Sequence, residues 1–434
     1  MDPATVGLIG ILVTVGLILL GINIGMVMFA VGLFGFGYIV NMNAAIGLFK
    51  TIPFAQATSF SVAVIPLFVL MGQFAFKSGM SSGLYDFSRK WFSGLPGPLA
   101  VATVAAAAGF SSICGSTTAT TATMTSLALP EMKEAKYDNG LACGSIVAGG
   151  TLGVLIPPST IFIMYGIMAE QSIGRLFCAG ILPGILLACL YIMTIVIVCK
   201  ARPGFAPGRE HFSWLERLSS LKHLISVGLL FIAVIGGMFS GFFTANEAAA
   251  IGAFIALVFI MIYRKMSLKT LLTSLKETVL TSGMIFQVML GAMVYNSFLT
   301  VSNLPINVAK WIISMDMNRY LVIALIFLIF LILGCCIDSI AMVLLTVPIF
   351  LPIITELGFS PICYGVMMVL AAEQGLMTPP VGMNVFIVSN MAKDIPIQKI
   401  FKGTLPFVAA IFACIVILIA FPQIALLLPG IIFG

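Results

Sequence analysis

The sequence contains very little charge: aspartate, glutamate, lysine and arginine make up 8% of its 434 residues, against about 25% in soluble domains. Apolar residues make up 61%, which excludes a soluble globular fold. At roughly 20 residues per crossing, this content bounds the chain at about a dozen membrane crossings. Runs such as 321–333 and 408–420 are apolar on every side, unlike the alternating strands of a membrane β-barrel. The sequence therefore predicts an all-α polytopic membrane protein.

Histidine is nearly absent as well. His211 and His223 lie in or beside the polar segment 200–222, so the apolar body holds no imidazole for a metal or for a nucleophile–base pair. No G-x-x-x-x-G-K-[ST] phosphate loop is present, which excludes an ATP-driven pump. The nine cysteines form no C-x-x-C pair, and we expect buried thiols. We expect no enzyme, no organic cofactor and, at a formal net charge of only +6, no nucleic-acid partner.

The chain repeats itself weakly at an offset of 222 residues. Pro157-Pro158 matches Pro379-Pro380 at this offset, and Gly153 matches Gly375. Their shared order predicts an internal duplication. The polar segment 200–222, with five basic residues against two acidic, separates the copies. We expect a first repeat at 1–199, a basic cytoplasmic linker at 200–222 and a second repeat at 223–434.

Basic loops predict opposite orientations for the two repeats. Short loops rich in lysine and arginine stay in the cytoplasm, which assigns segments 200–222 and 264–269 to that side. Counting crossings then puts 77–90 inside and its counterpart, 301–319, outside. We therefore expect two inverted repeats, a design found among secondary transporters.

Two short breaks interrupt the apolar runs with polar residues. The first, 109–123, holds a dense series of serine, threonine and glycine, and its counterpart, 334–341, contains Asp338 in an otherwise uncharged segment. Polar groups at this depth are buried in protein or line a wet cavity, and an acid there indicates function. We expect both breaks to be tips of re-entrant helical hairpins. Close packing through small residues, and a structural helix cap by Asp338, remain alternatives.

Each break has a downstream partner with a pair of prolines. Pro157-Pro158 and Pro379-Pro380 remove amide donors and unwind the helices in which they lie. The freed carbonyls and nearby hydroxyls are oxygen ligands, which suit sodium better than a transition metal. Plain proline kinks without an ion remain the alternative. Glu373 lies in the second segment and is a further candidate, whereas Glu247, three residues after Thr244, fits a structural capping box.

Six ordered segments cover essentially the whole chain: 59–72 (SFSVAVIPLFVLMG), 115–121 (GSTTATT), 149–159 (GGTLGVLIPPS), 244–250 (TANEAAA), 334–352 (GCCIDSIAMVLLTVPIFLP) and 378–386 (TPPVGMNVF). Together they resemble the large membrane subunit of tripartite ATP-independent periplasmic (TRAP) transporters. The family often has proline where this chain has Ala245, and a larger residue before the acid where it has Cys335-Cys336. These departures weaken the Thr244–Glu247 cap and alter packing at the second tip.

The resemblance implies a sodium-driven elevator in the bacterial inner membrane, in which a mobile domain with two hairpins slides against a scaffold. It implies two or more co-transported sodium ions (Na+) and an organic-acid substrate, a carboxylate or sulfonate such as a C4-dicarboxylate or sialic acid. Its implied partners are a small four-helix membrane subunit (Q type) and a periplasmic substrate-binding protein (P type). A self-sufficient sodium/anion elevator symporter is the alternative.

The resemblance also implies site residues, motif by motif. Substrate is expected between the two tips, and one sodium ion between each tip and the unwound segment of its own repeat. The implied substrate-binding residues are Ser111, Ser116, Thr117, Asp338, Ser339 and Asn384. The implied sodium-binding residues are Ser112, Gly115, Gly150, Thr151 and Pro157 in the first repeat, and Gly334, Cys336, Gly375, Thr378, Pro379 and Gly382 in the second.

Overall fold

The computed structural model describes residues 1–207, 211–315, 317–335 and 337–434. Every regular element in these ranges is a helix, which confirms the predicted all-α class. Seven of the described helices are long and apolar enough to cross a membrane. They are Phe60–Ser78, Ile173–Ala201, Trp214–Phe239, Ala245–Ile262, Leu268–Ser302, Ser339–Glu356 and Ile397–Ala420.

The helices up to Ala201 are interrupted between α6 and α7 and after α8, where the sequence predicted a polar break and a proline-broken segment. The α-helices are α1 (Pro3–Leu19), α2 (Ile24–Ile39), α3 (Met42–Thr58), α4 (Val64–Ser78), α5 (Met80–Trp91), α6 (Pro98–Cys114), α7 (Thr117–Glu134), α8 (Asn139–Thr151), α9 (Thr160–Met168) and α10 (Ile173–Ala201). Two 3-10 turns, η1 (Phe60–Ala63) and η2 (Leu152–Val154), precede α4 and follow α8.

The remaining described residues form a second series of helices. They are η3 (Pro203–Phe205), α11 (Trp214–Ser220), α12 (Lys222–Phe231), the π-helical turn η4 (Ile232–Gly236), α13 (Gly237–Phe239), α14 (Ala245–Ile262), α15 (Leu268–Ser302), α16 (Leu304–Ser314), α17 (Arg319–Gly334), α18 (Ser339–Glu356), α19 (Pro361–Gly375), α20 (Met383–Met391), α21 (Ile397–Ala420) and α22 (Gln423–Phe433).

Helices α3, α5 and α16 lie where the sequence suggested loops. Helix α5 is polar on one face, with Asp86, Arg89 and Lys90, and buries Leu84 and Tyr85 on the other. Average hydropathy finds helices that are apolar on all sides, so it passes over amphipathic helices of this kind. The segment expected as a linker also contains a helix, α11, which begins with a capping box.

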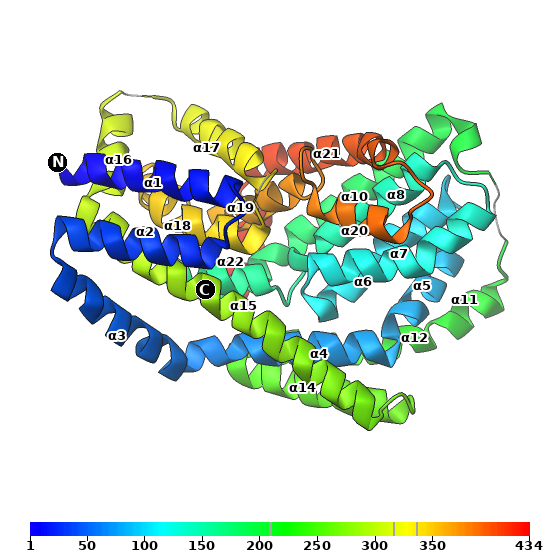
Figure 1. Ribbon diagram of the computed structural model, residues 1–434. Coiled ribbons are helices and arrows are strands. Elements are labelled where there is room, and N and C mark those ends of the chain that lie inside the picture. The colour runs from blue at the N-terminus through cyan, green and yellow to red at the C-terminus, as the bar shows by residue number, and fades with distance from the viewer. Residues whose placement is uncertain (208–210, 316, 336) are drawn as a thin grey trace.

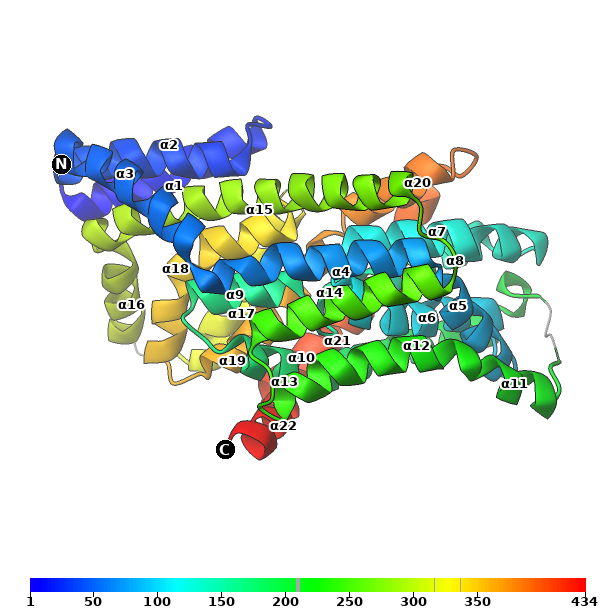
Figure 2. The same ribbon diagram turned by 90° about the horizontal axis from the view of Figure 1, so that it is seen from below.

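The long helices α15, α4 and α14 run side by side along one face of the molecule (Figure 2). Helices α8 and α19 lie at the centre, because every residue of 140–151 in α8 and of 363–375 in α19 is buried. Outer helices such as α12, α14 and α15 instead expose large apolar side chains, as lipid-facing helices do. The two proline-broken segments follow α8 and α19. The first is buried, whereas Pro379, Pro380 and Val381 of the second are exposed.

The segments assigned to the cytoplasm by their charge meet at one end of the molecule. Trp91 Nε1, directly after segment 77–90, donates to the Arg217 carbonyl at 3.3 Å, and Lys265 lies against Gly79. At the same end, Lys133 pairs with Asp394 at 2.7 Å. The Lys133 ammonium keeps the pKa of Asp394 below its usual value. Helices α5 and α11 lie at this end, whereas α16 lies at the opposite end (Figure 1).

A predicted helix cap and the state of the cysteines can be compared with the structure. The Thr244 side chain accepts from the Glu247 amide, and the Glu247 carboxylate accepts from the Thr244 amide at 2.8 Å, so the predicted capping box is confirmed. The described cysteines are free thiols. Six of them are buried, whereas Cys189 is exposed and Cys335 is half-buried.

Candidate functional site

The first polar break is a sharp corner between two helices. Helix α6 ends at Cys114, and Gly115 caps it with φ +61°, a conformation that glycine adopts without a steric penalty. Ser116 then caps α7, accepting from the Ala119 amide at 3.4 Å. We refer to residues 114–117 as the first tip. Only Gly115 and Ser116 separate the two helices, and α6 and α7 contact each other.

The first tip packs directly against the first proline-broken segment. Thr160 Oγ1 donates to the Gly115 carbonyl at 3.1 Å. A Cβ added to Gly115 would lie 2.6 Å from the Pro158 carbonyl oxygen, and one added to Gly153 would lie 2.8 Å from the Ser116 carbonyl oxygen. The main chains therefore touch, and the carbonyl oxygens of both segments come close together.

The second polar break corresponds to the first. Helix α17 ends at Gly334, and Asp338 caps α18 by accepting from the Ile340 amide at 3.1 Å. The alternative of a structural cap is thus realised. We refer to the described residues 334, 335 and 337–339 as the second tip; Cys336, an expected sodium-binding residue, lies outside the described residues.

The second tip packs against the second proline-broken segment. Cys335 Sγ lies 3.0 Å from Thr378 Oγ1, and the Val381 amide donates to the Cys335 carbonyl at 3.3 Å. A Cβ added to Gly334 would lie 3.2 Å from the Gly375 Cα. Each expected pair of tip and broken segment is therefore in contact.

Glu373 joins the two tips. Its carboxylate accepts from Thr117 Oγ1 of the first tip at 2.8 Å and from Ser339 Oγ of the second tip at 3.1 Å. The side chain is in the core, with the residue 1% exposed. The sequence marked Glu373 as a further candidate in the second segment, but nothing in the local sequence links it to Thr117. The arrangement brings the expected substrate-binding residues Thr117 and Ser339 to one carboxylate.

Tyr191 of α10 connects the two proline-broken segments. Its hydroxyl lies 2.8 Å from Thr151 Oγ1 and donates to Met377 Sδ at 3.9 Å. Thr151 Oγ1 also donates to the Ala148 carbonyl at 2.7 Å. The Thr151 hydroxyl, an expected sodium ligand, is therefore already engaged by protein groups.

The other expected residues differ in how their polar atoms are used. The hydroxyls of Ser111 and Ser112 donate to carbonyls of their own helix. Gly382 has φ +62° at the start of α20, and Pro157 and Pro379 each begin a cis peptide bond. Gly150 directly faces the side chain of Thr121.

Several buried polar atoms near the tips lack a hydrogen-bond partner in the described part of the chain. Asn384 is fully buried, and neither its amide oxygen nor its amide nitrogen is paired. The hydroxyls of Thr120 and Thr121 and the Gln374 Nε2 atom are also unpaired. Buried polar groups normally have hydrogen-bond partners. These unpaired atoms are therefore candidate donors and acceptors for a bound ion or substrate. Over the described ranges, no three His, Cys, Asp or Glu residues cluster as a metal site.

Two polar breaks between helices, each packed on a proline-broken segment of a polytopic membrane protein, are features of a transport protein. The chain belongs to the DctM component family of tripartite ATP-independent periplasmic transporters, whose family model matches residues 11–424. It is therefore a multi-pass permease of the inner membrane and not an enzyme. The family is one of ion-coupled transporters, and it implies DctQ and DctP partners.

Similar proteins are named for different substrates. The C4-dicarboxylate TRAP transporter large permease protein DctM of Pseudomonas aeruginosa is 33% identical over 393 residues, which is 89% of either chain. The sialic acid TRAP transporter large permease protein SiaM of Vibrio cholerae is 33% identical over 378 residues, 87% of this chain and 88% of that one. The isethionate TRAP transporter permease protein DctMQ of Oleidesulfovibrio alaskensis is 30% identical, and the match covers 92% of this chain and 64% of that one.

The fold also matches a solved structure. The crystal structure of the Alcanivorax borkumensis YdaH transporter superposes with a TM-score of 0.62, covering 99% of this chain and 98% of that one. At 13% identity, this similarity concerns the arrangement of helices alone.

Proposed function

We propose that this chain carries an organic anion across the bacterial inner membrane as the large permease of a TRAP transporter, driven by a sodium gradient. The similar proteins are named for C4-dicarboxylate, sialic acid, isethionate and 2,3-diketo-L-gulonate. All four are organic acids that are anionic at neutral pH. A carboxylate or sulfonate substrate is therefore the class that these relationships support.

The observation that carries the proposal is the meeting of both tips at Glu373. Thr117 and Ser339 each begin the helix that follows a tip, and both donate to the same carboxylate. The N-termini of α7 and α18 therefore point toward one place, and helix N-termini favour anions. We place the substrate between the tips, with Ser111, Ser116, Thr117, Asp338, Ser339 and Asn384 as candidate contacts.

Two sodium ions are proposed, one beside each tip. Main-chain carbonyls lie close together where the first tip contacts the segment around Pro157. At the second tip, Cys335 contacts Thr378 and Val381 in a similar way. Carbonyl and hydroxyl oxygens are ligands for a hard monovalent cation. The candidate residues remain Ser112, Gly115, Gly150, Thr151, Pro157, Gly334, Gly375, Thr378, Pro379 and Gly382.

An inverted duplication with re-entrant hairpins is proposed as the architecture. Its support is that helix boundaries recur at the offset of 222: α7 begins at Thr117 and ends at Glu134, and α18 begins at Ser339 and ends at Glu356. The amphipathic helices α5 and α16 also correspond at this offset, and they lie at opposite ends of the molecule (Figures 1 and 2). Opposite positions of equivalent helices are what inversion requires. In the proposed elevator, these helices connect the outer layer to the two hairpins.

A small membrane subunit of the Q type and a periplasmic binding protein of the P type are proposed as partners. The match with this chain covers 64% of the relative named DctMQ and leaves the rest of that protein unmatched. We propose that a separate Q-type subunit takes its place here.

Uptake into proteoliposomes tests the proposal. The chain is reconstituted with its small subunit, and the uptake of labelled organic acids is measured with and without a sodium gradient and the binding protein. We expect uptake only when all components and inward sodium are present. Uptake by this chain alone with sodium would instead favour a self-sufficient symporter, and uptake that is indifferent to sodium would refute sodium coupling.

A further inference from the structure

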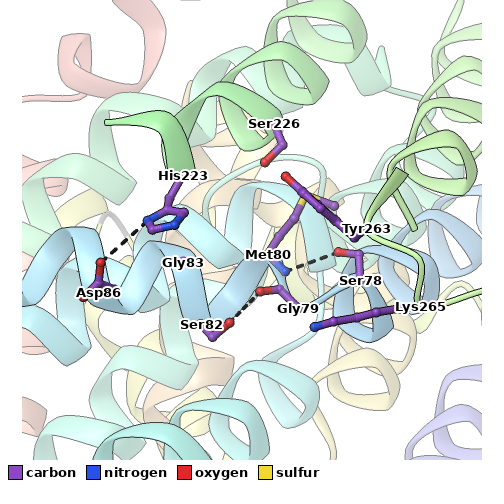
Figure 3. Close-up of a pocket in the computed structure, with 10 residues that line it drawn as sticks. All are labelled: Ser78, Gly79, Met80, Ser82, Gly83, Asp86, His223, Ser226, Tyr263 and Lys265. Carbon is purple, nitrogen blue, oxygen red and sulfur yellow. Dashed lines mark hydrogen bonds and ion pairs between the residues drawn. The ribbon is translucent and has the colours of Figure 1, made fainter. Parts of the chain in front are cut away.

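A polar cleft of about 430 Å³ lies at the end of the molecule where the basic segments meet. Three separate parts of the chain line it: the corner between α4 and α5, the start of α12, and the loop after α14 (Figure 3). Its polar side chains include Ser78, Ser82, His223, Ser226, Tyr263 and Lys265. None of these residues belongs to the tips or to the proline-broken segments.

The cleft lies at the depth where helices leave the bilayer. Ser78 is the last residue of one candidate membrane span, Phe60–Ser78, and Tyr263 directly follows another, Ala245–Ile262. His223 lies in the first part of a third, Trp214–Phe239. Tyrosine and basic residues at span ends mark the level of the lipid headgroups.

Among the described residues that line the cleft, Lys265 is an ammonium group without an ion-pair partner. Lys265 extends toward Gly79, so closely that a Cβ added to this glycine would overlap its Nζ atom (Figure 3). Among the described residues, Lys265 makes no ion pair. The acid in the lining, Asp86, is bound by Lys90 at 2.7 Å and by His223 Nδ1 at 3.6 Å. The negative charge is thus balanced, and the positive charge of Lys265 is not.

An apolar surface leads away from the cleft along α12 and α14, which contact each other. Large side chains on both helices are exposed along this surface, with exposed fractions of 65% for Ile225 and 59% for Met261. Others are Leu229 on α12, and Phe254 and Ile262 on α14. Acyl chains would bury this apolar surface, whereas a small anion such as free phosphate would not contact it.

We propose that the cleft binds the phosphate headgroup of an anionic membrane phospholipid, with Lys265 as the counter-ion and the acyl chains lying along α12 and α14. Basic pockets between membrane helices on the cytoplasmic side are suited to such headgroups. The hydroxyl of Tyr263 points toward Ser226 across the cleft (Figure 3), so both can donate to the phosphate. Gly79, the joint between α4 and α5, has φ +82°. A bound lipid touches both sides of this joint and restrains it against α12.

Native mass spectrometry of the purified complex with its small subunit tests the site, with phosphatidylglycerol as the titrated lipid. Lys265→Gln should weaken binding about fivefold, the contribution of one lysine near the headgroups. The matched control is Lys269→Gln, which removes a lysine four residues further on that does not line the cleft. It should change binding less than twofold. Equal losses in the two variants would refute a defined site, because general surface attraction would explain them.

A second variant blocks the cleft without changing its charge. Ser82 is exposed at the rim, so Ser82→Phe leaves the core intact and fills the space for the headgroup. It should lower phosphatidylglycerol binding at least as much as Lys265→Gln, and unchanged binding would refute the proposal. Inorganic phosphate is the competing arm. If phosphate displaces the lipid at equal concentration, the site recognises free phosphate and the lipid assignment is wrong.

Discussion

The two tips differ in charge although their helices begin at corresponding residues. Helices α7 and α18 each have 18 residues, and the offset of 222 relates Ser116 to Asp338 as their N-caps. One cap is a neutral hydroxyl and the other is a carboxylate. The same offset relates Thr151 to Glu373. The first half therefore offers hydroxyl and carbonyl oxygens at these positions, and the second half offers two acids.

This difference shows how two similar backbones share one charged group. Thr117 and Ser339 are equivalent at the same offset, and both donate to Glu373. The equivalent position in the first half, Thr151, instead contacts Tyr191. At these positions only the second half has carboxylates, and the first tip contacts one of them through the Thr117 hydroxyl. Removing a carboxylate should therefore affect uptake more than removing the corresponding hydroxyl of the first half.

The largest effect is expected at Glu373. Glu373→Ala removes the acceptor for two buried hydroxyls, each costing about 1–3 kcal/mol when left unpaired, so uptake should fall at least about thirtyfold. Glu373→Gln retains an oxygen acceptor and should lose less. Sodium-driven uptake in proteoliposomes measures both. Glu356→Gln, at the exposed end of α18, is the matched control and should show wild-type uptake. Wild-type uptake by Glu373→Ala would refute the proposal that transport depends on the contact of both tips with Glu373.

Removing the charged cap should have the next largest effect. Asp338→Ala should lower uptake about tenfold or more while membrane insertion stays normal, whereas Ser116→Ala at the neutral cap should lower it only a few-fold. Asp338→Asn keeps a capping side chain, so the gap between Asn and Ala at this position separates capping from charge. If Asn at position 338 supports full uptake, the charge of Asp338 has no role and the two tips are chemically equivalent.

A smaller effect is expected from the threonines of the broken segments. Thr378→Ala and Thr151→Ala should each raise the sodium concentration for half-maximal uptake about three- to tenfold if both hydroxyls contribute to sodium binding. Uptake measured over a range of sodium concentrations gives this value. Tyr191→Phe leaves Thr151 in place and removes only the partner hydroxyl, so an identical shift in this variant would mean that Thr151 acts through its contact with Tyr191.

The last prediction concerns orientation and involves no change in uptake. Single cysteines replacing Lys222 and Lys310, both exposed, should react with a membrane-impermeant thiol reagent from opposite sides of the membrane. The exposed Cys189 is first replaced by serine to remove background. Labelling of both positions from the same side would refute the inverted arrangement, whatever the chemistry of the tips.

Sequence patterns predicted the apolar helices well and the amphipathic ones poorly. The apolar run 321–333 lies within α17 (Arg319–Gly334), and the Thr244–Glu247 capping box is present as expected. Both depend on local composition. Helices α5 and α16 depend instead on which face packs against the rest of the molecule, which no local average of hydropathy contains.

The sequence predicted where the helices of the candidate site break, but it did not predict the contact that connects the breaks. The tips and the broken segments were located because glycine, proline and hydroxyl residues mark them locally. Thr117 and Glu373 are 256 residues apart in the chain, so only folding brings them together. The one available signal was the offset of 222, which pairs Thr117 with Ser339 but does not reveal their shared acceptor.

Gly153 and Gly375 leave no space for a side chain, because the first backs onto the main chain of Ser116 and the second onto that of Gly334. The apolar faces toward the lipid can drift among leucine, isoleucine, valine and phenylalanine without harm. Gly153 and Gly375 cannot be replaced in this way, because any side chain would overlap the facing main chain. If the two halves arose by duplication, both copies retain the same steric restriction. Among distant descendants, we expect this spacing of two invariant glycines to outlast most of the surrounding sequence.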